Sequence, residues 1–395
     1  MLFPQSAYIH IPFCRRRCFY CDFPIAVAGD RARGETSSRM QTYVNTLCRE
    51  IQAAPVIGPA LRTVFFGGGT PSLLSVTQIE QILGAVRDRF GIAHDAEISI
   101  EMDPGTFNRA TLETLRHLSI NRVSLGVQSF QDAQLEACGR THRVQDVDQA
   151  IEDLQAIAIP TWSLDLISGL PHQTIADWEL SLGTAIAVSP PHISVYDLTV
   201  EPGTVFNRRY VAGQSPLPSD DATTHMYRMA QSLLTQAGYQ HYEISNYAQP
   251  GHQCQHNRVY WENKPCYGFG MGAASYTQQQ RFNRPRTTHE YDAWVEAYCQ
   301  ADGKLDCPPA TRTDQWLDRL MMGLRLAEGI RLDELVAEFG PDLVDRLKQC
   351  LAPYCRKGWV ALSEPPSPTL RLTDPEGFLF SNVVLVKLFE TFSDP

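Results

Sequence analysis

The alternation of two hydrophobic periodicities constrains the fold of this chain more than any other feature. From residue 8 to about residue 245, short runs of β-branched and aromatic residues alternate with segments whose apolar residues recur every three or four positions. Consecutive parallel strands need a crossover of about a dozen residues, which the helical segments supply. The pattern therefore predicts an α/β fold built on a parallel sheet. The expected strands are 8–13, 63–66, 97–102, 122–127, 163–168 and 193–198, with 241–246 as a weaker seventh.

The segment 77–90 shows how the helices are expected to cover the sheet. Thr77 and Glu80 have the spacing of a capping box, which marks the amino terminus of a helix. The apolar residues that follow repeat on one face, and that face should pack on the sheet. Six or seven such units are fewer than the eight of a closed TIM barrel. We therefore expect an incomplete (β/α)6-type TIM barrel.

The alternation of strands and helices ends near residue 249, which suggests that the chain has three structural parts. Residues 1–248 would form the barrel. Residues 249–312, rich in Gly, Gln and aromatic residues, look like an irregular segment that crosses the barrel mouth. Residues 313–395 are read as two helices, a small hairpin and a last amphipathic helix, a pattern that resembles a winged helix. That fold often binds DNA, but the acidic balance of the chain argues against this use.

Composition limits the classes of partner and the compartment. The chain has 34 Lys and Arg against 44 Asp and Glu, a net charge of −10, which disfavours nucleic acid or an anionic membrane as the main partner. No apolar stretch approaches the roughly 18 residues of a membrane helix, and the start lacks the pattern of a signal peptide. Eleven cysteines without a repeated spacing are a poor disulfide framework. We expect no nucleic acid partner, no membrane span and a cytoplasmic location.

Three of the cysteines stand apart from the rest. Cys14, Cys18 and Cys21 lie within eight residues, directly after the first expected strand. Thiolates hold iron–sulfur clusters, and three ligands on a four-iron cluster leave one iron open to an outside ligand. A zinc site, which needs a fourth ligand nearby, and unrelated thiols are the alternatives. The three arginines between Cys14 and Cys18 are interpreted as a solvated loop tip rather than as partners of the thiolates.

Polar residues mark the ends of several expected strands. The glycine turn at 67–70 follows the second strand, where it either brings bare backbone N–H groups close to a ligand or simply reverses the chain. Glu101, Gln128 and Asp165 lie at or near the ends of the next three strands, where a polar group is costly unless it is hydrogen-bonded. In α/β barrels the carboxyl ends of the strands meet on the face that carries the active site. This topology favours one shared polar ligand over separate loop contacts.

Longer stretches of the sequence resemble a known family. They run nearly end to end and include YIHIPFCRRRCFYCDF, FFGGGTPSLL, IEMDPGT, NRVSLGVQSF with GRTH, DLISGLPHQT, HNRVYW, and GLRL and FLFSNVVL near the carboxyl end. The chain resembles the radical S-adenosylmethionine (SAM) enzymes, within them the branch of the oxygen-independent coproporphyrinogen III oxidases and the HemW-type haem chaperones. The resemblance implies a 4Fe–4S cluster on Cys14, Cys18 and Cys21, whose open iron binds the amino and carboxyl groups of SAM.

The same resemblance implies that further residues of the barrel bind SAM. Aromatic side chains would lie against the cofactor, a glycine-threonine turn would cradle its amino acid portion, and polar residues near the strand ends would bind it or contact the nucleotide or a second cofactor molecule. The protein would orient and shield the radical that forms when SAM is cleaved. These residues are Tyr8 and Tyr20 for the first role, Gly68, Gly69 and Thr70 for the second, and Glu101, Gln128, Arg140 and Asp165 for the third.

Three features distinguish the chain from the oxidases of this branch. Asp22 and Phe23 follow the third cysteine, whereas the oxidases carry a further cysteine two positions beyond their third cluster ligand. Seven residues precede Tyr8, whereas the oxidases have a longer segment there that helps to enclose the porphyrinogen. The third feature is HNRVYW at 256–261, preceded by Cys254, a pattern associated with the haem chaperones.

The HNRVYW motif has two interpretations. Histidine is a common ligand of haem iron, and Tyr and Trp offer flat apolar area to a porphyrin edge. Alternatively, His256 and Asn257 anchor a buried loop while the aromatic residues fill the core. The family context favours haem, with the axial ligand open among His256, Cys254 and other histidines. The candidate haem residues are His256, Asn257, Tyr260 and Trp261.

Two functions from different classes remain in play. The first is a carrier that binds haem and delivers it to apoproteins, and the missing cysteine favours it. The alternative is an oxidoreductase that decarboxylates coproporphyrinogen III by radical chemistry, so the sequence leaves open whether the chain is an enzyme. The expected cofactors are a 4Fe–4S cluster, SAM and haem. The expected partners are haem or porphyrin, haem-accepting apoproteins and an electron donor to the cluster, with a homodimer as a further option.

Overall fold

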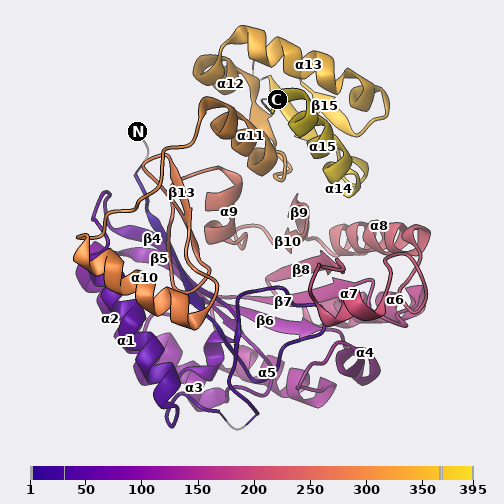
Figure 1. Ribbon diagram of the computed structural model, residues 1–395. Coiled ribbons are helices and arrows are strands. Elements are labelled where there is room, and N and C mark those ends of the chain that lie inside the picture. Colours follow the sequence, from indigo (N-terminus) through magenta and orange to yellow (C-terminus); the bar gives the residue numbers. More distant parts are fainter. Residues whose placement is uncertain (1–2, 31, 364–365, 367, 394–395) are drawn as a thin grey trace.

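The computed structural model describes residues 3–30, 32–363, 366 and 368–393. Its largest element is a nine-stranded sheet in the order β11-β1-β4-β5-β6-β7-β8-β10-β9. Six of these strands run parallel, each beside the next along the chain. Figure 1 shows them fanned into a partial barrel with helices outside, so the predicted incomplete α/β barrel is confirmed. The six strands are β1 (Ser6–Ile11), β4 (Leu61–Gly68), β5 (Ile92–Met102), β6 (Arg122–Gln128), β7 (Thr161–Ser168) and β8 (His192–Asp197).

The helices between the strands bury one face against the sheet. In α2 (Val76–Phe90) the expected capping box at Thr77 and Glu80 is wrong. The helix begins earlier, because Ser75 and Gln78 satisfy the same sequence pattern and exchange side-chain-to-backbone hydrogen bonds. None of the described helices combines the length and apolar character that a membrane-spanning helix needs. The other barrel helices are α1 (Ser38–Ala53), α3 (Arg109–His117), α4 (Asp132–Ala137), α5 (Val144–Ile157), α6 (Ile175–Val188), α7 (Val205–Arg209) and α8 (Asp220–Gln236).

Short strands extend the sheet at both edges. The weak seventh strand is in fact two, β9 (Gln240–Glu243) and β10 (Asn246–Ala248), and β10 runs antiparallel to β8. At the other edge β11 (Tyr267–Phe269) pairs parallel with β1. β9 and β11 are the two ends of the sheet, so the barrel is open between them.

Residues 249–312 are more regular than the expected irregular segment. Besides β11 they contain α9 (Gln255–Trp261), the hairpin of β12 (Ala274–Thr277) and β13 (Gln280–Asn283), and α10 (Thr288–Gln300), which packs against α1. Strands of three or four residues beside glycines are too short to show an alternating pattern. The sequence therefore indicated irregular structure where the chain in fact forms regular elements.

A buried ion pair attaches this segment to the barrel. The Glu50 carboxylate of α1, 0% exposed, accepts a hydrogen bond from Arg284 Nε at 2.8 Å, and the Arg284 side chain is 2% exposed. The same carboxylate accepts hydrogen bonds from the Tyr291 hydroxyl at 2.6 Å and from the Gly270 N–H at 2.8 Å. One buried carboxylate thus holds α10 and the residues that directly follow β11 and β13 on the first helix of the barrel.

The C-terminal domain has a hydrophobic core of its own. It contains the predicted helices and hairpin, and in addition a short strand, a further helix before the hairpin and a short helix after it, with a sheet in the order β14-β16-β15. An ion pair of Arg228 with Glu376 (2.7 Å) and a hydrogen bond between His241 Nδ1 and the Asp374 carboxylate (2.8 Å) link it to the barrel. Figure 1 shows it on the side of α9. Its elements are α11 (Arg312–Gly323), β14 (Ile330–Arg331), α12 (Leu332–Phe339), α13 (Pro341–Arg356), β15 (Val360–Leu362), β16 (Thr369–Leu372), α14 (Glu376–Leu379) and α15 (Ser381–Phe392).

Candidate functional site

The three-cysteine loop follows β1 at the carboxyl end of the barrel. Two short strands, β2 (Phe13–Cys14) and β3 (Ala26–Val27), pair with each other and close the loop at its base. The Cys21 N–H donates to the Cys18 carbonyl at 3.2 Å, which makes a turn between these two cysteines. The side chains of all three cysteines line one cavity.

Aromatic residues hold the loop in place. Phe19 packs on Phe206 with ring centroids 6.3 Å apart, and its N–H donates to the Cys138 carbonyl at 2.9 Å. Tyr20 packs on the same Phe206 ring, also at 6.3 Å, and lines the cavity. Cys138 is fully buried in the small apolar cluster beneath. The loop therefore stands on a fixed apolar base.

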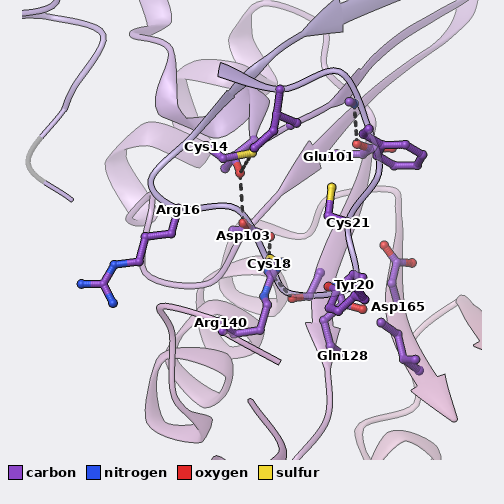
Figure 2. Close-up of a pocket in the computed structure, with 18 of the residues that line it drawn as sticks. Cys14, Arg16, Cys18, Tyr20, Cys21, Glu101, Asp103, Gln128, Arg140 and Asp165 are labelled. Carbon is purple, nitrogen blue, oxygen red and sulfur yellow. Dashed lines mark hydrogen bonds and ion pairs between the residues drawn. The ribbon is translucent and has the colours of Figure 1, made fainter. Parts of the chain in front are cut away.

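The cavity has a volume of about 370 Å³ and lies at the carboxyl ends of the parallel strands. Figure 2 shows the cysteines and the polar strand-end residues around one space. Residues as far apart in the sequence as Cys14 and Asp165 thus lie around one cavity, because the strands that carry them are neighbours in the sheet. The expected site residues that line it are Cys14, Cys18, Tyr20, Cys21, Gly68, Gly69, Thr70, Glu101, Gln128, Arg140 and Asp165.

The glycine turn after β4 does not present free backbone donors. The Gly68 N–H donates to the Glu101 carboxylate at 2.9 Å, and the N–H groups of Gly69 and Thr70 donate to backbone carbonyls of the β1–β2 segment at 2.8 and 2.7 Å. Gly68 has a φ of +113°, and a Cβ there would lie 2.4 Å from the His10 ring. Glycine is therefore needed for a close approach to β1, and the expectation of bare N–H groups is wrong.

Two half-buried carboxyl groups, those of Glu101 and Asp165, form the inner wall of the cavity. Burial raises the pKa of Glu101 from 4.5 to about 8, against the hydrogen bond from the Gly68 N–H and with the help of the nearby charges of Asp165 and Asp103. Burial also raises the pKa of Asp165, against hydrogen bonds from the hydroxyls of Ser124 (2.7 Å) and Ser163 (3.2 Å). A positively charged ligand group beside them would lower the cost of ionising both. The wall is therefore suited to an ammonium or sulfonium group.

Arg140 connects the cysteine loop to the end of β5. Its side chain is 8% exposed, one N–H donates to Cys18 Sγ at 3.4 Å, and the guanidinium forms an ion pair with Asp103. Asp103 also accepts a hydrogen bond from the Thr70 hydroxyl at 3.0 Å, and that hydroxyl lies 3.8 Å from Cys14 Sγ. Sequence reasoning missed Asp103, although its position two residues beyond the expected strand-end glutamate was a usable signal.

The raised pKa of Glu101 predicts a pH-dependent stability. Unfolded glutamate loses its proton near pH 4.5, whereas the folded side chain keeps it to about pH 8, so unfolding releases a proton in this window. The free energy of unfolding contributed by Glu101 is therefore highest at low pH and falls as pH rises through 8. We expect Glu101→Gln to stabilise the ligand-free protein at pH 8.5 by about 1 kcal/mol or more, and much less at pH 5. Urea denaturation at both pH values measures this, with the exposed Glu113→Gln as the control; a pH-independent effect would contradict it.

A second cavity, of about 160 Å³, lies next to the first inside the barrel. Tyr8 lines this cavity rather than the first, with its hydroxyl hydrogen-bonded to His10 Nδ1 at 3.0 Å. His256 lines it too and is 1% exposed. Both of its ring nitrogens are hydrogen-bonded, Nδ1 to the Thr63 hydroxyl at 2.7 Å and Nε2 to the Tyr260 hydroxyl at 3.0 Å. Burial lowers the pKa of His256 to about 3, so the ring is neutral.

The structure separates the HNRVYW residues into two groups. His256, Asn257 and Tyr260 line the small cavity, as does Cys254, which is 2% exposed. The volume of this small cavity, about 160 Å³, is below the several hundred Å³ of pockets that hold a ligand of drug size or larger, so the cavity is too small for haem. Trp261 instead lines a groove of about 850 Å³ between α9 and the C-terminal domain, and the Arg325 guanidinium lies 4.3 Å from its ring.

Comparison with known proteins agrees with this arrangement. Residues 8–184 match the model of the Radical SAM superfamily, and residues 310–379 match the HemN C-terminal domain. The chain is 46% identical to the heme chaperone HemW of Synechocystis sp., covering 100% of this chain and 98% of that one. It is 34% identical to the heme chaperone HemW of Escherichia coli, covering 90% and 93%. The solved structure of coproporphyrinogen III oxidase (HemN) from Escherichia coli has the same fold, with a TM-score of 0.81 at 24% identity over 98% of this chain and 90% of that one.

A three-cysteine loop at the mouth of a partial α/β barrel, together with these matches, defines a radical SAM protein. The class implies a 4Fe–4S cluster and SAM. Within it the chain belongs to the HemW family, because the similarity extends over both domains and almost the whole length of the relatives.

Proposed function

We propose that this protein binds haem and delivers it to apoproteins in the cytoplasm, with a 4Fe–4S cluster and SAM in the barrel. The observation that carries the proposal is the 46% identity to a heme chaperone over the whole chain. The absence of the additional cysteine of the oxidases, whose place Phe23 takes, supports the carrier. The eleven cysteines, all free, support a reducing compartment.

The cavity fits the cofactors that the class implies. Three thiols from one loop are the ligand set of a four-iron cluster with one open iron, and the cluster would supply the electron for cleaving the sulfonium bond of SAM. Arg140 would stabilise the thiolate of Cys18, to whose sulfur it donates at 3.4 Å. Burial raises the pKa of Cys14 to about 12, so cluster assembly must release protons from the loop. We assign the contacts with SAM to Tyr20, Gly68, Gly69, Thr70, Glu101, Gln128, Arg140 and Asp165, with Tyr8 behind Glu101.

We place the haem in the groove beside Trp261. Its volume of about 850 Å³ suits a large ligand, and Trp261, Tyr276 and Leu326 give it apolar area. Arg319 and Arg331 also line the groove, but they are ion-paired with Glu334 and Asp333, so propionates would have to displace these carboxylates. The buried residues of the motif would then support α9, and through it Trp261, rather than bind the iron themselves.

Haem titration tests both the function and the placement. We expect anaerobically reconstituted protein to take up about one haem per chain with a shift of the Soret band, and to form no protoporphyrinogen from coproporphyrinogen with SAM and a reductant. Trp261→Ala should weaken haem binding about tenfold, because a large aromatic contact is lost. His256→Gln should leave the Soret spectrum unchanged, as should the remote control Trp359→Ala.

Two results would contradict this proposal. Sustained decarboxylation of coproporphyrinogen would make the protein an oxidase. Loss of the haem spectrum in His256→Gln, with Trp261→Ala unaffected, would move the haem to an opened form of the small cavity.

A further inference from the structure

The outer face of the cysteine loop concentrates positive charge on an acidic protein. Residues 13–40 contain six arginines against three carboxylates, whereas the whole chain carries a net charge of −10. Within the described part of the chain, one arginine of this face, Arg16, forms an ion pair, with the exposed Asp30. Arg15 and Arg16 lie at the rim of the cavity, and in Figure 2 the Arg16 guanidinium extends away from the cysteines. We call this face the basic collar, formed by Arg15, Arg16, Arg17, Arg33, Arg39 and Arg286.

Backbone carbonyls hold several of these arginines in position. Arg17 donates to the Cys21 and Phe23 carbonyls at 3.1 Å, Arg39 to the Val27 carbonyl at 3.2 Å, and Arg286 to the Asp22 carbonyl at 2.8 Å. A neutral carbonyl orients a guanidinium without cancelling its charge. Arg17, Arg39 and Arg286 are therefore fixed in place and keep their charge, as in preorganised binding surfaces, whereas the charge of Arg16 is compensated by Asp30.

Exposed apolar residues lie among the arginines. Phe23 is 56% exposed and Val27 is 51% exposed, and their carbonyls are the ones that Arg17 and Arg39 bind. An apolar centre with a charged rim is the common anatomy of a protein interface. Interfaces of transient electron-transfer partners are small and are guided by charge.

We propose that the basic collar is the docking surface of a small acidic one-electron carrier protein. The cysteines belong to the same loop, and Arg15, Arg16 and Phe23 lie on the cysteine side of the cavity, whereas Glu101 and Asp165 belong to its inner wall. The carrier would therefore dock at the cysteine side while SAM occupies the inner wall. In the transfer, the reduced carrier loses one electron and the cluster gains it, and no bond is made or broken. The inference rests on the cluster of the proposed function but not on haem binding.

A flavodoxin, as an acidic flavoprotein, serves as the probe. We expect flavodoxin hydroquinone to reduce the cluster of the full-length protein in stopped-flow experiments, with a rate that falls steeply as salt is raised from about 20 to 300 mM. The triple variant Arg17→Gln/Arg39→Gln/Arg286→Gln should be reduced about tenfold more slowly. Calorimetry should show a matching loss of affinity for oxidised flavodoxin. Reduction by dithionite, which needs no docking surface, should be unchanged.

Two further variants separate charge from structure. The triple Arg→Lys variant at the same positions keeps the charge and should retain most of the rate. A control triple at exposed arginines elsewhere, Arg87→Gln/Arg356→Gln/Arg371→Gln, should behave like the wild type. If the Gln variant loses iron, the salt dependence of the wild type and the Lys variant still decides the question.

Three outcomes would overturn the inference. They are flavodoxin reduction that is insensitive to salt and to the Gln variant, no reduction of the wild type by flavodoxin while dithionite works, and a Gln variant that loses haem uptake but not reduction. A Gln variant that loses haem uptake but not reduction would mean that the basic collar binds the carboxylates of the tetrapyrrole instead of a carrier protein. Failure of haem binding in the wild type, with salt-dependent reduction intact, would reject the carrier function and leave this docking surface standing.

Discussion

Cys18→Ser is expected to abolish the iron–sulfur cluster. Cys18 lies between the other two cysteines of the loop, lines the cavity and accepts a hydrogen bond from Arg140, so no other thiol of the loop can take its place. A serine hydroxyl is a poor ligand for cluster iron compared with a thiolate. After anaerobic reconstitution, the variant should lack the visible absorption of the cluster and hold less than about a tenth of the wild-type iron and sulfide.

The matched control is Cys48→Ser, which changes a buried thiol on α1 outside the cavity. This variant should keep the full iron and sulfide content. The circular dichroism of both variants should match the wild type, because the loop is anchored by Phe19 and Tyr20 rather than by the sulfur atoms. Full iron and sulfide in Cys18→Ser would reject the ligand assignment.

Arg284→Met is expected to destabilise the protein by about 3 to 5 kcal/mol. The substitution removes the counter-charge of Glu50 while the carboxylate stays fully buried with Tyr291 and Gly270. Removing one partner of a buried ion pair typically has an effect of this size. Urea denaturation measures the loss, and limited proteolysis within residues 270–300 should show that this segment detaches first.

Two companion variants test the explanation. Adding Glu50→Gln to Arg284→Met should recover part of the loss, because the buried charge is gone. Arg62→Met breaks an exposed pair with Asp95, whose side chain is 67% exposed, and should change stability by less than about 1 kcal/mol. A loss below about 1 kcal/mol for Arg284→Met would mean that water reaches Glu50 in solution.

The barrel could be predicted from sequence because its strands are buried on both faces and alternate with amphipathic helices. The carboxyl-end rule predicts that Glu101, Gln128 and Asp165 surround one cavity, and in the structure all three line it. The cysteine loop was visible from its spacing alone. In each case a repeated or local sequence pattern was enough for the prediction, because the topology of a parallel α/β fold determines where the strand ends lie.

Other features depend on contacts that no local pattern reveals. β11 has three residues, and only its pairing with β1 makes it a strand. The sequence leaves open whether the N–H groups of the glycine turn face a ligand or only reverse the chain; in the structure Glu101 and the β1–β2 backbone accept from them. The sequence also could not show that the His256 ring is already hydrogen-bonded, because its partner Thr63 is 193 residues away along the chain. Hydrogen bonds between distant segments decide whether a polar group is free, and the sequence does not show them.

The position of the C-terminal domain separates the cysteine site from the groove in which we propose that haem binds. The groove beside Trp261 includes Phe3 and Pro4, which precede β1, whereas the cysteines follow it. A strand of six residues spans about 20 Å. A macrocycle held in this groove would thus lie about the length of a strand away from the cysteines. Helix α9 reaches both places, because Trp261 lines the groove while His256 and Tyr260 line the small cavity beside the cysteine site, so a change at one end could be transmitted to the other through this helix.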